Sequence, residues 1–287
     1  MDINSTVELN NGVRMPMLGL GVFRSPAGEI TRSAVRTALE YGYRMIDTAR
    51  IYCNEKSVGR GIQDAGVARE QVFVTTKLWK EDWANPRQGL EQSLERLGLD
   101  YVDLYLLHWP FHGYEQAYLA LEELQKEGLC KAIGVSNFKE HHLESLKAAG
   151  ATVVPQVNQV ECHPQNSEEE LLAYCRKHNI VMEAYSPLGG QGQSLVGDPR
   201  VTSLSAYLKV TPAQVLLRWN LQRGVVVIPK SVRPERIKEN SQLFNFELSL
   251  DEMDAISSIN ANLRRAFDSD RIDQRPAATF PKIVEEE

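Results

Sequence analysis

Short apolar runs alternate with helix-like segments along almost the whole chain. Eight runs of five to eight residues recur, at 17–22, 44–48, 72–77, 102–108, 131–136, 154–161, 181–187 and 225–230. Between them, apolar residues return every three or four positions, as on one face of an α-helix. A strand followed by a helix, repeated eight times, predicts an α/β fold with a parallel sheet. Eight such units in 287 residues favour a closed (β/α)8 TIM barrel over an open doubly wound sheet.

Residues at the segment ends support this reading. Segment 85–98 has Leu90, Leu94 and Leu97 on one face and closes at Gly98, a predicted C-cap. Segment 211–224 begins with Thr211 as N-cap and a proline at the first helical position. Segments 114–128 and 167–179 are similar, and the latter has its acids first and its bases last. The start of the chain, TVELNNGVRMP (6–16), predicts a β-hairpin around Asn-Gly.

No linker divides the chain, so we expect residues 1–287 to form one barrel domain. The glycine-rich stretch 189–200 predicts a long loop of the kind that is often functional. Beyond about residue 260 the sequence has no clear element, and we expect this tail to extend over the barrel. No G-x-G-x-x-G joins a strand to a helix, which disfavours a Rossmann domain.

Composition excludes several classes of partner. The chain is 43% hydrophobic and 24% charged, with a net charge of -6, and it has no basic run. We therefore expect no nucleic-acid and no membrane partner. The first twenty residues lack a cationic start followed by an apolar run, so we expect no signal peptide, and no apolar stretch approaches about 18 residues. Its four cysteines are far apart, which predicts reduced structural thiols in a cytoplasmic protein.

The histidines do not suggest a metal site. His141 and His142 are adjacent, so we expect them not to share a helix face, and no H-E-x-x-H occurs. His112, His163 and His178 are expected to be structural. The sequence therefore predicts no zinc.

Four titratable residues stand at successive strand ends. In a barrel, side chains that do chemistry lie at the carboxyl ends of the strands. Asp47 ends the second predicted strand and Tyr52 follows it, while Lys77 and His108 end the third and fourth. Each alone is more often a cap, a packing residue or a solvated charge. Together they predict a catalytic rim.

The expected chemistry is proton transfer. A free tyrosine titrates near pH 10, and a lysine cation about 4 Å away favours phenolate by up to about 4 kcal/mol. Burial favours a neutral lysine, which an adjacent carboxylate opposes. We therefore expect Asp47 to keep Lys77 charged, Lys77 to lower the pKa of Tyr52, and Tyr52 to protonate a developing alkoxide, with His108 donating a second hydrogen bond. None of these groups is a reductant, so a hydride cofactor is needed.

Seven motifs, in order along the chain, resemble the aldo-keto reductase family. They are GYRMIDTARIYCNE, TTKLW, DLYLLHWP, AIGVSNF, VNQVECHP, EAYSPLG and IPKSVRPERIKEN. The resemblance runs from about Val7 to Asn260 and is strongest to short members such as 2,5-diketogluconate reductases and protozoan prostaglandin F synthases. It implies the same catalytic set, Asp47, Tyr52, Lys77 and His108.

The resemblance also implies NADPH bound across the barrel mouth. A lysine and an arginine suit the dianionic 2′-phosphate, which favours NADPH over NADH. The implied contacts are Gly21, Val22 and Asp47; Ser136, Asn137 and Gln159 at the nicotinamide amide; Tyr185 stacked on its ring; Ser186 and Leu188 at the pyrophosphate loop; Lys230, Ser231, Val232 and Arg236 around the 2′-phosphate; and Glu239 and Asn240 at the adenine.

The implied substrate pocket is aromatic. Phe23, Trp79 and Trp109 match its walls, beside His108. This chain has Met45 and Arg50 where most relatives have histidine and alanine. We expect Met45 only to repack the strand and Arg50 to point outward, since turned inward it would compete with Lys77 for Asp47 or attract anionic substrates. The tail does not match the longer closing loop of steroid-reducing members, which predicts a more open pocket.

The leading hypothesis is an NADPH-dependent reductase of aldehydes, ketones or quinones, including prostaglandin F synthase activity, and a monomer. One alternative is an NADPH-binding regulatory or interaction module with slow turnover. Another is an aldolase with Lys77 as a Schiff-base amine, which the adjacent acid disfavours because the amine must be neutral to attack.

Overall fold

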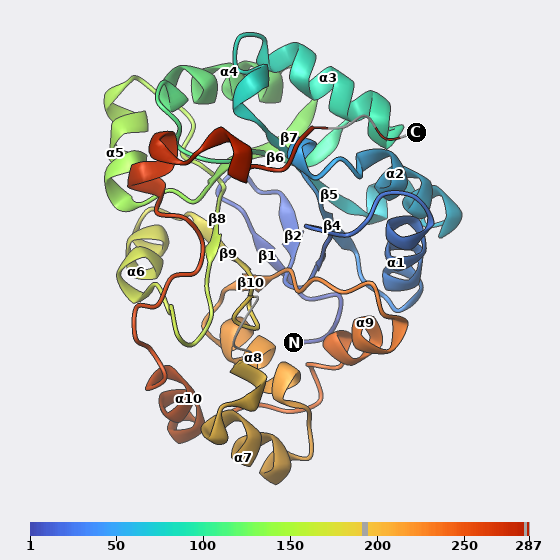
Figure 1. Ribbon diagram of the computed structural model, residues 1–287, viewed down its shortest axis with the longest axis vertical. Helices are drawn as coiled ribbons and strands as arrows, with labels where there is room; N and C mark the ends of the chain where they lie inside the picture. The colour runs from blue at the N-terminus through green and yellow to red at the C-terminus, as the bar shows by residue number, and fades with distance from the viewer. Residues whose placement is uncertain (191–194, 284–285, 287) are drawn as a thin grey trace.

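Eight parallel strands form the centre of the molecule and helices surround them (Figure 1). The computed structural model describes residues 1–190, 195–283 and 286. Neighbouring strands pair in the order β10-β9-β8-β7-β6-β5-β4-β3, and parallel bridges from Leu18 to Val227 and from Gly21 to Lys230 close the sheet. The predicted (β/α)8 barrel is confirmed. Its strands are β3 Leu20–Gly21, β4 Met45–Asp47, β5 Phe73–Leu78, β6 Val102–Leu107, β7 Cys130–Ser136, β8 Val157–Glu161, β9 Val181–Tyr185 and β10 Val226–Val227.

Helices follow the strands and cover the outside of the sheet. They are α1 Glu29–Glu40, α2 Glu55–Asp64, α3 Pro86–Leu97, α4 Tyr114–Lys126, α5 Glu140–Ala148, α6 Glu169–Lys177, α7 Pro199–Leu208, α8 Pro212–Gln222, α9 Pro234–Ser241 and α10 Leu250–Ser257. Short 3-10 helices are η1 Arg50–Tyr52, η2 Arg69–Gln71, η3 Lys80–Asp82, η4 Leu195–Gly197, η5 Ser269–Gln274 and η6 Ala277–Thr279. Within the described ranges, no helix has the length and apolar character needed to cross a membrane.

The predicted helix ends are confirmed. Gly98 caps α3 in the left-handed conformation, with φ 65°. Thr211 accepts a hydrogen bond from the backbone N–H of Gln214, whose side chain returns a bond to the Thr211 N–H. Such reciprocal capping stabilises a helix start by about 1 kcal/mol. The structure also buries Leu90, Leu94 and Leu97 beneath α3.

The glycine-rich stretch 189–200 is shorter as a loop than predicted. Within it, Leu195–Gly197 forms η4 and Pro199 begins α7, while residues 191–194 lie outside the described part. Asp198 is the N-cap, since its carboxylate accepts from the Arg200 backbone N–H at 2.9 Å, and a proline follows it. An N-cap followed by a proline is a helix-start signal, and this helix was not predicted from it.

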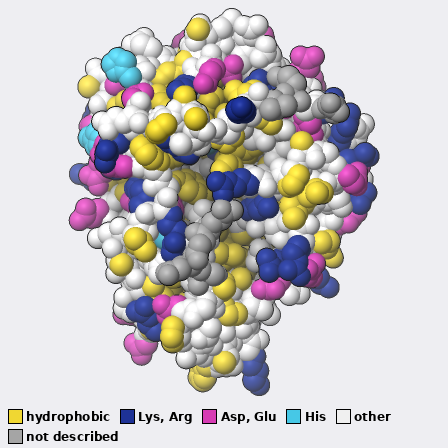
Figure 2. Space-filling model, in the orientation of Figure 1, with side chains coloured by type: hydrophobic (Ala, Val, Ile, Leu, Met, Phe, Trp, Pro, Cys, Tyr) yellow, Lys and Arg dark blue, Asp and Glu magenta, His cyan; other side chains and the backbone are white. Residues whose placement is uncertain are grey.

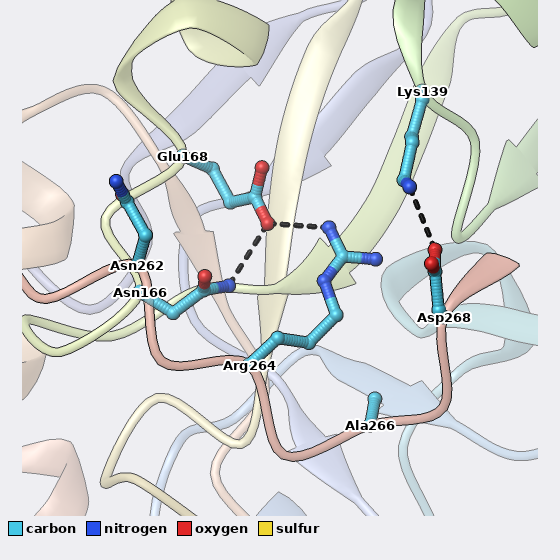
Figure 3. A pocket seen from close by; sticks show the side chains of 7 residues that line it. All are labelled: Lys139, Asn166, Glu168, Asn262, Arg264, Ala266 and Asp268. Carbon is cyan, nitrogen blue, oxygen red and sulfur yellow. Dashed lines mark hydrogen bonds and ion pairs between the residues drawn. The ribbon is translucent and has the colours of Figure 1, made fainter. Parts of the chain in front are cut away.

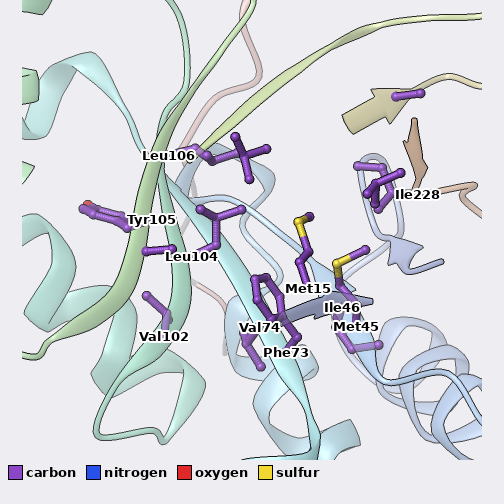
Figure 4. Close-up of a cluster of buried hydrophobic side chains, with 14 of the residues drawn as sticks. Met15, Met45, Ile46, Phe73, Val74, Val102, Leu104, Tyr105, Leu106 and Ile228 are labelled. Atoms are coloured by element: carbon purple, nitrogen blue, oxygen red, sulfur yellow. The ribbon is translucent and has the colours of Figure 1, made fainter. Parts of the chain in front are cut away.

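The hydrophobic core fills the space between sheet and helices and the lower barrel interior. Figure 4 shows part of this cluster, including Met15, Met45 and Ile228. Met45 is fully buried. A Cβ added to Gly19 would lie 2.6 Å from Met45 Cε, so the methionine occupies the space beside this glycine. Met45 therefore repacks the barrel seam, as predicted. Burial of each such side chain contributes about 1.5–3 kcal/mol.

The predicted hairpin is confirmed and lies against the amino ends of the strands. It consists of β1 Thr6–Glu8 and β2 Arg14–Pro16. Asn10 Nδ2 donates to the carbonyl oxygens of Pro155 and Asn179, just before β8 and β9. The carboxyl ends of the strands are thus left to carry the site.

The C-terminal tail crosses the carboxyl side of the barrel (Figure 1). Its segment 265–266 hydrogen-bonds Glu161 at the end of β8, and Asp273 accepts from the His112 backbone N–H at 3.0 Å. Farther on, the carbonyl oxygen of Lys282 accepts from Cys53 Sγ at 3.6 Å. The tail contains η5 and η6, which the sequence did not predict. That the chain forms a single domain stays a prediction.

Candidate active site

The four titratable residues predicted at the strand ends lie together at the carboxyl rim. Asp47 is the last residue of β4, Tyr52 the last of η1, Lys77 lies in β5, and His108 directly follows β6. Lys77 Nζ lies 2.7 Å from both carboxylate oxygens of Asp47 and 3.4 Å from Tyr52 Oη. The rings of Tyr52 and His108 are 5.6 Å apart, edge to face. The geometry thus forms one connected set of polar groups.

The loop after β4 returns Tyr52 toward Lys77 because it is held at two points. Its 3-10 turn closes with the Tyr52 N–H donating to Ala49, and Cys53 ends it in the left-handed conformation, φ 55°. Asn54 is fully buried. Its Oδ1 accepts from Thr48 Oγ1 at 2.8 Å, and its Nδ2 donates to the Val22 carbonyl at 3.0 Å. Asn54 therefore ties this loop to the end of the first barrel strand.

The expected direction of the Tyr52 pKa is wrong for this structure. Burial, then the negative charges of Asp47 and Glu183, raise the pKa of Tyr52 well above its ordinary value. Lys77 does not reverse this, because it is already ion-paired with Asp47 on both carboxylate oxygens and also donates to the Thr48 carbonyl at 2.8 Å. Tyr52 is therefore a phenol that keeps its proton until a stronger base appears. Such a group suits proton donation.

His108 is a neutral hydrogen-bonding group. Burial, and then the charge of Lys77, lower the pKa of His108 well below its ordinary value. Asn137 Nδ2 donates to the backbone carbonyl of His108 at 3.0 Å, which fixes the end of β6. Within the described residues, His108 Nδ1 has no hydrogen-bond partner. A neutral imidazole can donate one hydrogen bond to an oxygen in the barrel mouth.

The residues predicted to contact a nicotinamide also converge. Ser136 and Asn137 are buried at the end of β7, Gln159 is buried in the middle of β8, and Tyr185 ends β9. Tyr185 Oη donates to Asn137 Oδ1 at 2.7 Å, and Ser136 Oγ donates to the Gln159 carbonyl at 2.9 Å. Ser186, with φ 51°, and Leu188 follow Tyr185 into the turn that precedes residues 191–194. These groups form a polar shelf beside Tyr52.

The residues predicted for the adenosine end lie after β10, at the start of α9. Lys230 and Arg236 are exposed, whereas Ser231 and Asn240 are buried and Val232 is half-buried. In the part of the chain that the structure describes, neither Lys230 nor Arg236 forms an ion pair, while their neighbour Arg233 pairs with Glu235. Unpaired cations beside a helix start suit an anion.

Two predicted contacts have structural roles as well. Glu239 accepts from Thr211 Oγ1 at 2.7 Å, so one of its oxygens already serves the start of α8. Gly21 lies at the barrel seam, where an added Cβ would stand 2.8 Å from the Ile228 carbonyl oxygen. Val22 is fully buried behind it.

Aromatic rings line the opening beside the rim. Trp79 and Trp109 are buried, and Phe23 is 44% exposed with its ring 5.0 Å from Tyr52. Trp79 also contacts the ring of His108 at 5.2 Å. Figure 2 shows hydrophobic side chains together with Lys and Arg side chains around the middle of this face, over the barrel strands of Figure 1.

The tail packs against the aromatic side chains beside the rim. The ring of Phe280 lies 5.3 Å from Trp79 and 5.8 Å from Phe111, and Ile272 belongs to the same apolar cluster. The more open pocket expected from the sequence stays a prediction. Ile272 and Phe280 were missed because no pattern in an irregular tail indicates where its side chains pack, and Phe111, in the loop after β6, was not singled out.

Arg50 neither points outward nor reaches Asp47. Its side chain is only 11% exposed, and its Nε lies 4.0 Å from Asp82 Oδ2 in η3. The expected outward orientation is wrong, because the side chain is largely buried and its guanidinium lies beside the Asp82 carboxylate. Arg50 thus does not compete with Lys77.

One acid of the site was missed. Glu183, in the middle of β9, is fully buried and lies level with Gln159 on β8. Gln159 Nε2 donates to Glu183 Oε2 at 2.7 Å and to Asp47 Oδ2 at 2.8 Å. A charged residue within the apolar run 181–187 was the signal that could have found it.

The adjacent histidines do converge, contrary to expectation. His141 Nε2 and His142 Nε2 lie 3.0 and 3.4 Å from Asp270 Oδ1 in η5, since both rings stand on the first turn of α5. The ligand atoms lie within 4.8 Å of one another, a spacing that suits a metal ion. However, Lys139 Nζ lies 2.6 Å from the same carboxylate, and His142 Nδ1 accepts the Lys139 backbone N–H. These contacts favour a docking point for the tail.

A separate polar pocket of about 450 Å³ lies between the tail and the starts of α5 and α6 (Figure 3). Its charged walls pair with each other. Arg264 Nη2 and Asn166 Nδ2 donate to Glu168 Oε1 at 2.6 and 2.9 Å, and Lys139 Nζ donates to Asp268 at 2.6 Å. None of the four rim residues lines it, so it is distinct from the candidate active site.

The cysteines take no part in the rim chemistry. None of the four forms a disulfide in the part of the chain that the structure describes, and Cys130, Cys162 and Cys175 are buried. Burial raises the pKa of Cys130 and Cys175 to about 12 and that of Cys162 to about 11. Protonated, buried thiols of this kind are inert packing groups.

Fold and rim together describe a barrel with a cluster of titratable residues at the carboxyl ends of its strands, as suits an enzyme. The chain belongs to the aldo/keto reductase family, whose model matches residues 18–261. It is therefore an oxidoreductase. Glyoxal reductase of Bacillus subtilis is 49% identical to it, over 91% of this chain and 95% of the relative. The 9,11-endoperoxide prostaglandin H2 reductase of Trypanosoma cruzi is 45% identical, over 92% and 94% of the two chains.

A solved structure is similar throughout. An aldo-keto reductase of Bombyx mori, in complex with NADP, superposes with a TM-score of 0.88 at 37% identity, covering 95% of this chain and 98% of that one. The predicted family and enzyme class are confirmed.

Proposed function

We propose that the protein reduces aldehydes, ketones or quinones to alcohols with NADPH, and that Tyr52 donates the proton. The observation that carries the proposal is the contact of Lys77 Nζ with both Asp47 oxygens at 2.7 Å and with Tyr52 Oη at 3.4 Å. Because Lys77 donates to the phenol oxygen, the phenolic hydrogen remains available for a carbonyl oxygen in the barrel mouth.

In the proposed reaction, the carbonyl carbon gains a hydride and its oxygen gains a proton. A reduced nicotinamide cofactor supplies the hydride, which no side chain of the rim can supply. Tyr52 gives its proton to the oxygen as negative charge develops there, since an alkoxide is a stronger base than a phenolate. Neutral His108 donates a hydrogen bond to the same oxygen. Lys77 then stabilises the phenolate until water returns a proton.

The shelf beside Tyr52 fits a nicotinamide amide. Gln159 Nε2 uses both hydrogens on Asp47 and Glu183, so its Oε1 is left to accept from a carboxamide N–H. Ser136 and Asn137 flank that position, and Tyr185 would offer its ring face to the nicotinamide. Asp47, Gly21 and Val22 line the same region at the barrel seam.

The start of α9 fits a 2′-phosphate. Lys230 and Arg236 are cations that the described residues leave without a carboxylate partner, and Ser231 and Val232 lie between them in sequence. Glu239 and Asn240 follow for the adenine, with Ser186 and Leu188 toward the pyrophosphate. This charge distribution supports NADPH over NADH.

The aromatic opening fits a small carbonyl compound. Trp79, Trp109 and Phe23 would contact the apolar part of the substrate while His108 orients the oxygen. The names of two relatives, a glyoxal reductase and a prostaglandin H2 reductase, suggest dicarbonyls first and an endoperoxide second. A monomer in the cytoplasm stays our expectation.

The aldolase alternative finds no support, because Lys77 is held as an ion pair rather than as a free amine. The test of the proposed function is consumption of NADPH with methylglyoxal, aromatic aldehydes, a quinone and prostaglandin H2, with identification of each product. Steady turnover to the alcohol with NADPH supports it. Tight NADPH binding without turnover on any of these compounds would instead indicate the regulatory module.

A further inference from the structure

Glu183 is a buried carboxyl group that lacks a cationic partner. It lies in β9 with no exposed surface. Its Oε2 accepts one hydrogen bond, from Gln159 Nε2 at 2.7 Å, and its Oε1 has none within the described part of the chain. Lys77 does not pair with it, since the ammonium group contacts Asp47, the Thr48 carbonyl and Tyr52 Oη instead. Burying an unpaired carboxylate is costly, so the neutral acid is favoured.

A single amide joins Glu183 to the catalytic rim. A primary amide nitrogen carries two hydrogens. Gln159 directs one to Glu183 Oε2 and the other to Asp47 Oδ2, at 2.7 and 2.8 Å. The buried chain of contacts is therefore Tyr52–Lys77–Asp47–Gln159–Glu183, running across the barrel from β5 and β4 to β8 and β9. A change of charge at one end acts on the other through buried side chains, where charges are screened less than at the surface.

We propose that Glu183 is a positioning residue of the reaction, and that the charge of its carboxyl group controls how strongly Tyr52 holds its proton. The inference rests on the proposed function, because it concerns the same proton donor. Glu183 also orients the Gln159 amide, which leaves Oε1 of Gln159 toward the cofactor site.

Among the titratable groups in this region, Glu183 has the pKa that lies nearest to neutral pH. Burial, then the charge of Asp47, raise the pKa of Glu183 to about 8. The pKa of His108, after β6, is lowered well below its ordinary value, and burial raises the pKa of Tyr185, above Glu183 on β9. Glu161, at the end of β8, has a lowered pKa and faces the tail. The Asp47–Lys77 ion pair completes this set.

The direction in which Glu183 shifts the pKa of Tyr52 follows from the charge of its carboxyl group. Below pH 8 Glu183 holds a proton and adds little negative potential at Tyr52. Above pH 8 it is ionised, and its negative charge disfavours the phenolate, which raises the pKa of Tyr52 further. Ionised Glu183 therefore keeps Tyr52 protonated in alkaline solution. Carbonyl reduction is sustained at high pH, while alcohol oxidation, which needs the phenolate, is held back.

The test compares Glu183→Gln with the wild type in both reaction directions, from pH 6 to pH 10. Glutamine is neutral at every pH and nearly isosteric. We expect the ratio of the oxidation rate of Glu183→Gln to that of the wild type to rise by up to about 10-fold between pH 6.5 and pH 9, because only the wild type gains a negative charge near Tyr52 over that range. The corresponding ratio for reduction should stay constant, because Tyr52 remains protonated in both proteins. Glu122→Gln is the matched control, because Glu122 is also a buried acid but lies in α4. Its oxidation rate should follow that of the wild type at every pH.

An oxidation ratio that stays constant from pH 6.5 to pH 9 in folded Glu183→Gln would overturn the inference while leaving the proposed function intact, provided that Tyr52→Phe is inactive. If Tyr52→Phe were active, the proposed function itself would fail. A second measurement does not depend on the variant folding. The infrared spectrum of the wild-type holoenzyme should show the C=O stretch of a protonated carboxyl group at pH 7 that disappears by pH 9.5. Absence of that band at pH 7 would equally overturn it.

Discussion

The ammonium group of Lys77 lies 2.7 Å from each carboxylate oxygen of Asp47, and both side chains are buried, at 0% and 3% exposure. Such a pair positions its neighbours firmly, because neither charge can separate without leaving the other unpaired in the barrel interior. Tyr52 and Gln159 are held on opposite sides of this pair. The pair is therefore the fixed point from which the rest of the site is organised.

Removing either partner of the pair should destabilise the fold. We expect Asp47→Asn or Lys77→Met to lower the free energy of unfolding by about 3–5 kcal/mol, because each leaves one buried charge unpaired. The double variant should lose less than the sum of the two. Urea denaturation of all four proteins measures this coupling. Single variants within about 1 kcal/mol of the wild type would show that the pair is not a structural anchor.

Arg236 should discriminate between the two nicotinamide cofactors. Without an ion-pair partner in the described residues, its guanidinium is available for a 2′-phosphate. We expect Arg236→Ala to weaken NADPH binding by about 10- to 100-fold, the value of one charge-assisted hydrogen bond, and to change NADH binding little. Quenching of protein fluorescence gives both dissociation constants. Arg233→Ala is the matched control, since Arg233 already pairs with Glu235; equal losses in the two variants would argue against a specific phosphate contact.

Phe280 should restrict the size of the substrate. Its ring stands 5.3 Å from Trp79, so Phe280→Ala removes one wall of the opening. We expect the ratio of kcat/KM for a bulky aromatic aldehyde to that for methylglyoxal to rise by about 10-fold, as for other changes of pocket volume. Phe244→Ala, on the main core, should leave the ratio as it is. An unchanged ratio in Phe280→Ala would mean that the tail does not shape the substrate pocket.

Glu161 should hold the tail at neutral pH and release it in acid. Burial raises the pKa of Glu161, but hydrogen bonds from His163 and from the Ala266 and Arg265 N–H groups outweigh it, so the pKa lies below its ordinary value. A depressed folded-state pKa contributes stability above the unfolded-state pKa of about 4.3, and this contribution disappears as pH falls through the folded-state value.

Hydrogen exchange of the Arg265 and Ala266 amides tests this anchor. Protection factors, corrected for intrinsic exchange at each pH, should stay level above about pH 5 and drop as the pH falls below about 4. Glu161→Gln should lower them about 10- to 100-fold at pH 7. Glu122→Gln is the control, because Glu122 also accepts hydrogen bonds from two backbone N–H groups, those of Thr152 and Val153. This variant should lower the protection of the Thr152 and Val153 amides and leave the tail amides protected. Undiminished protection of the tail in Glu161→Gln would show that Glu161 is not its anchor.

Much of the fold was predictable because its determinants are local. The eight strands are apolar runs with helices between them, and Asn85, Thr211 and Gly98 occupy helix ends that their chemistry favours. The α7 helix was missed although Asp198 and Pro199 form the same kind of start, because the preceding glycines suggested a continuous loop.

The site was predictable where its residues stand on strands and not where they depend on the tail. Asp47, Lys77 and His108 follow from the rule that chemistry lies at strand ends. Phe280, and the contact of His141 and His142 with Asp270, arise from an irregular segment that crosses the rim, and no periodicity indicates that path. The direction of the Tyr52 pKa shift was missed because the burial of the phenol, which is the largest cause of the shift, was left out and Glu183 had not been placed beside the rim.

The most direct measurement is the single-turnover rate of methylglyoxal reduction by Tyr52→Phe, with NADPH bound. If Tyr52 donates the proton, the rate falls by about 10²- to 10⁴-fold, the dissociation constant of NADPH stays within about twofold, and Tyr207→Phe, altered at an exposed position on α7, matches the wild type. If Tyr52→Phe turns over as fast as the wild type, Tyr52 is not the proton donor.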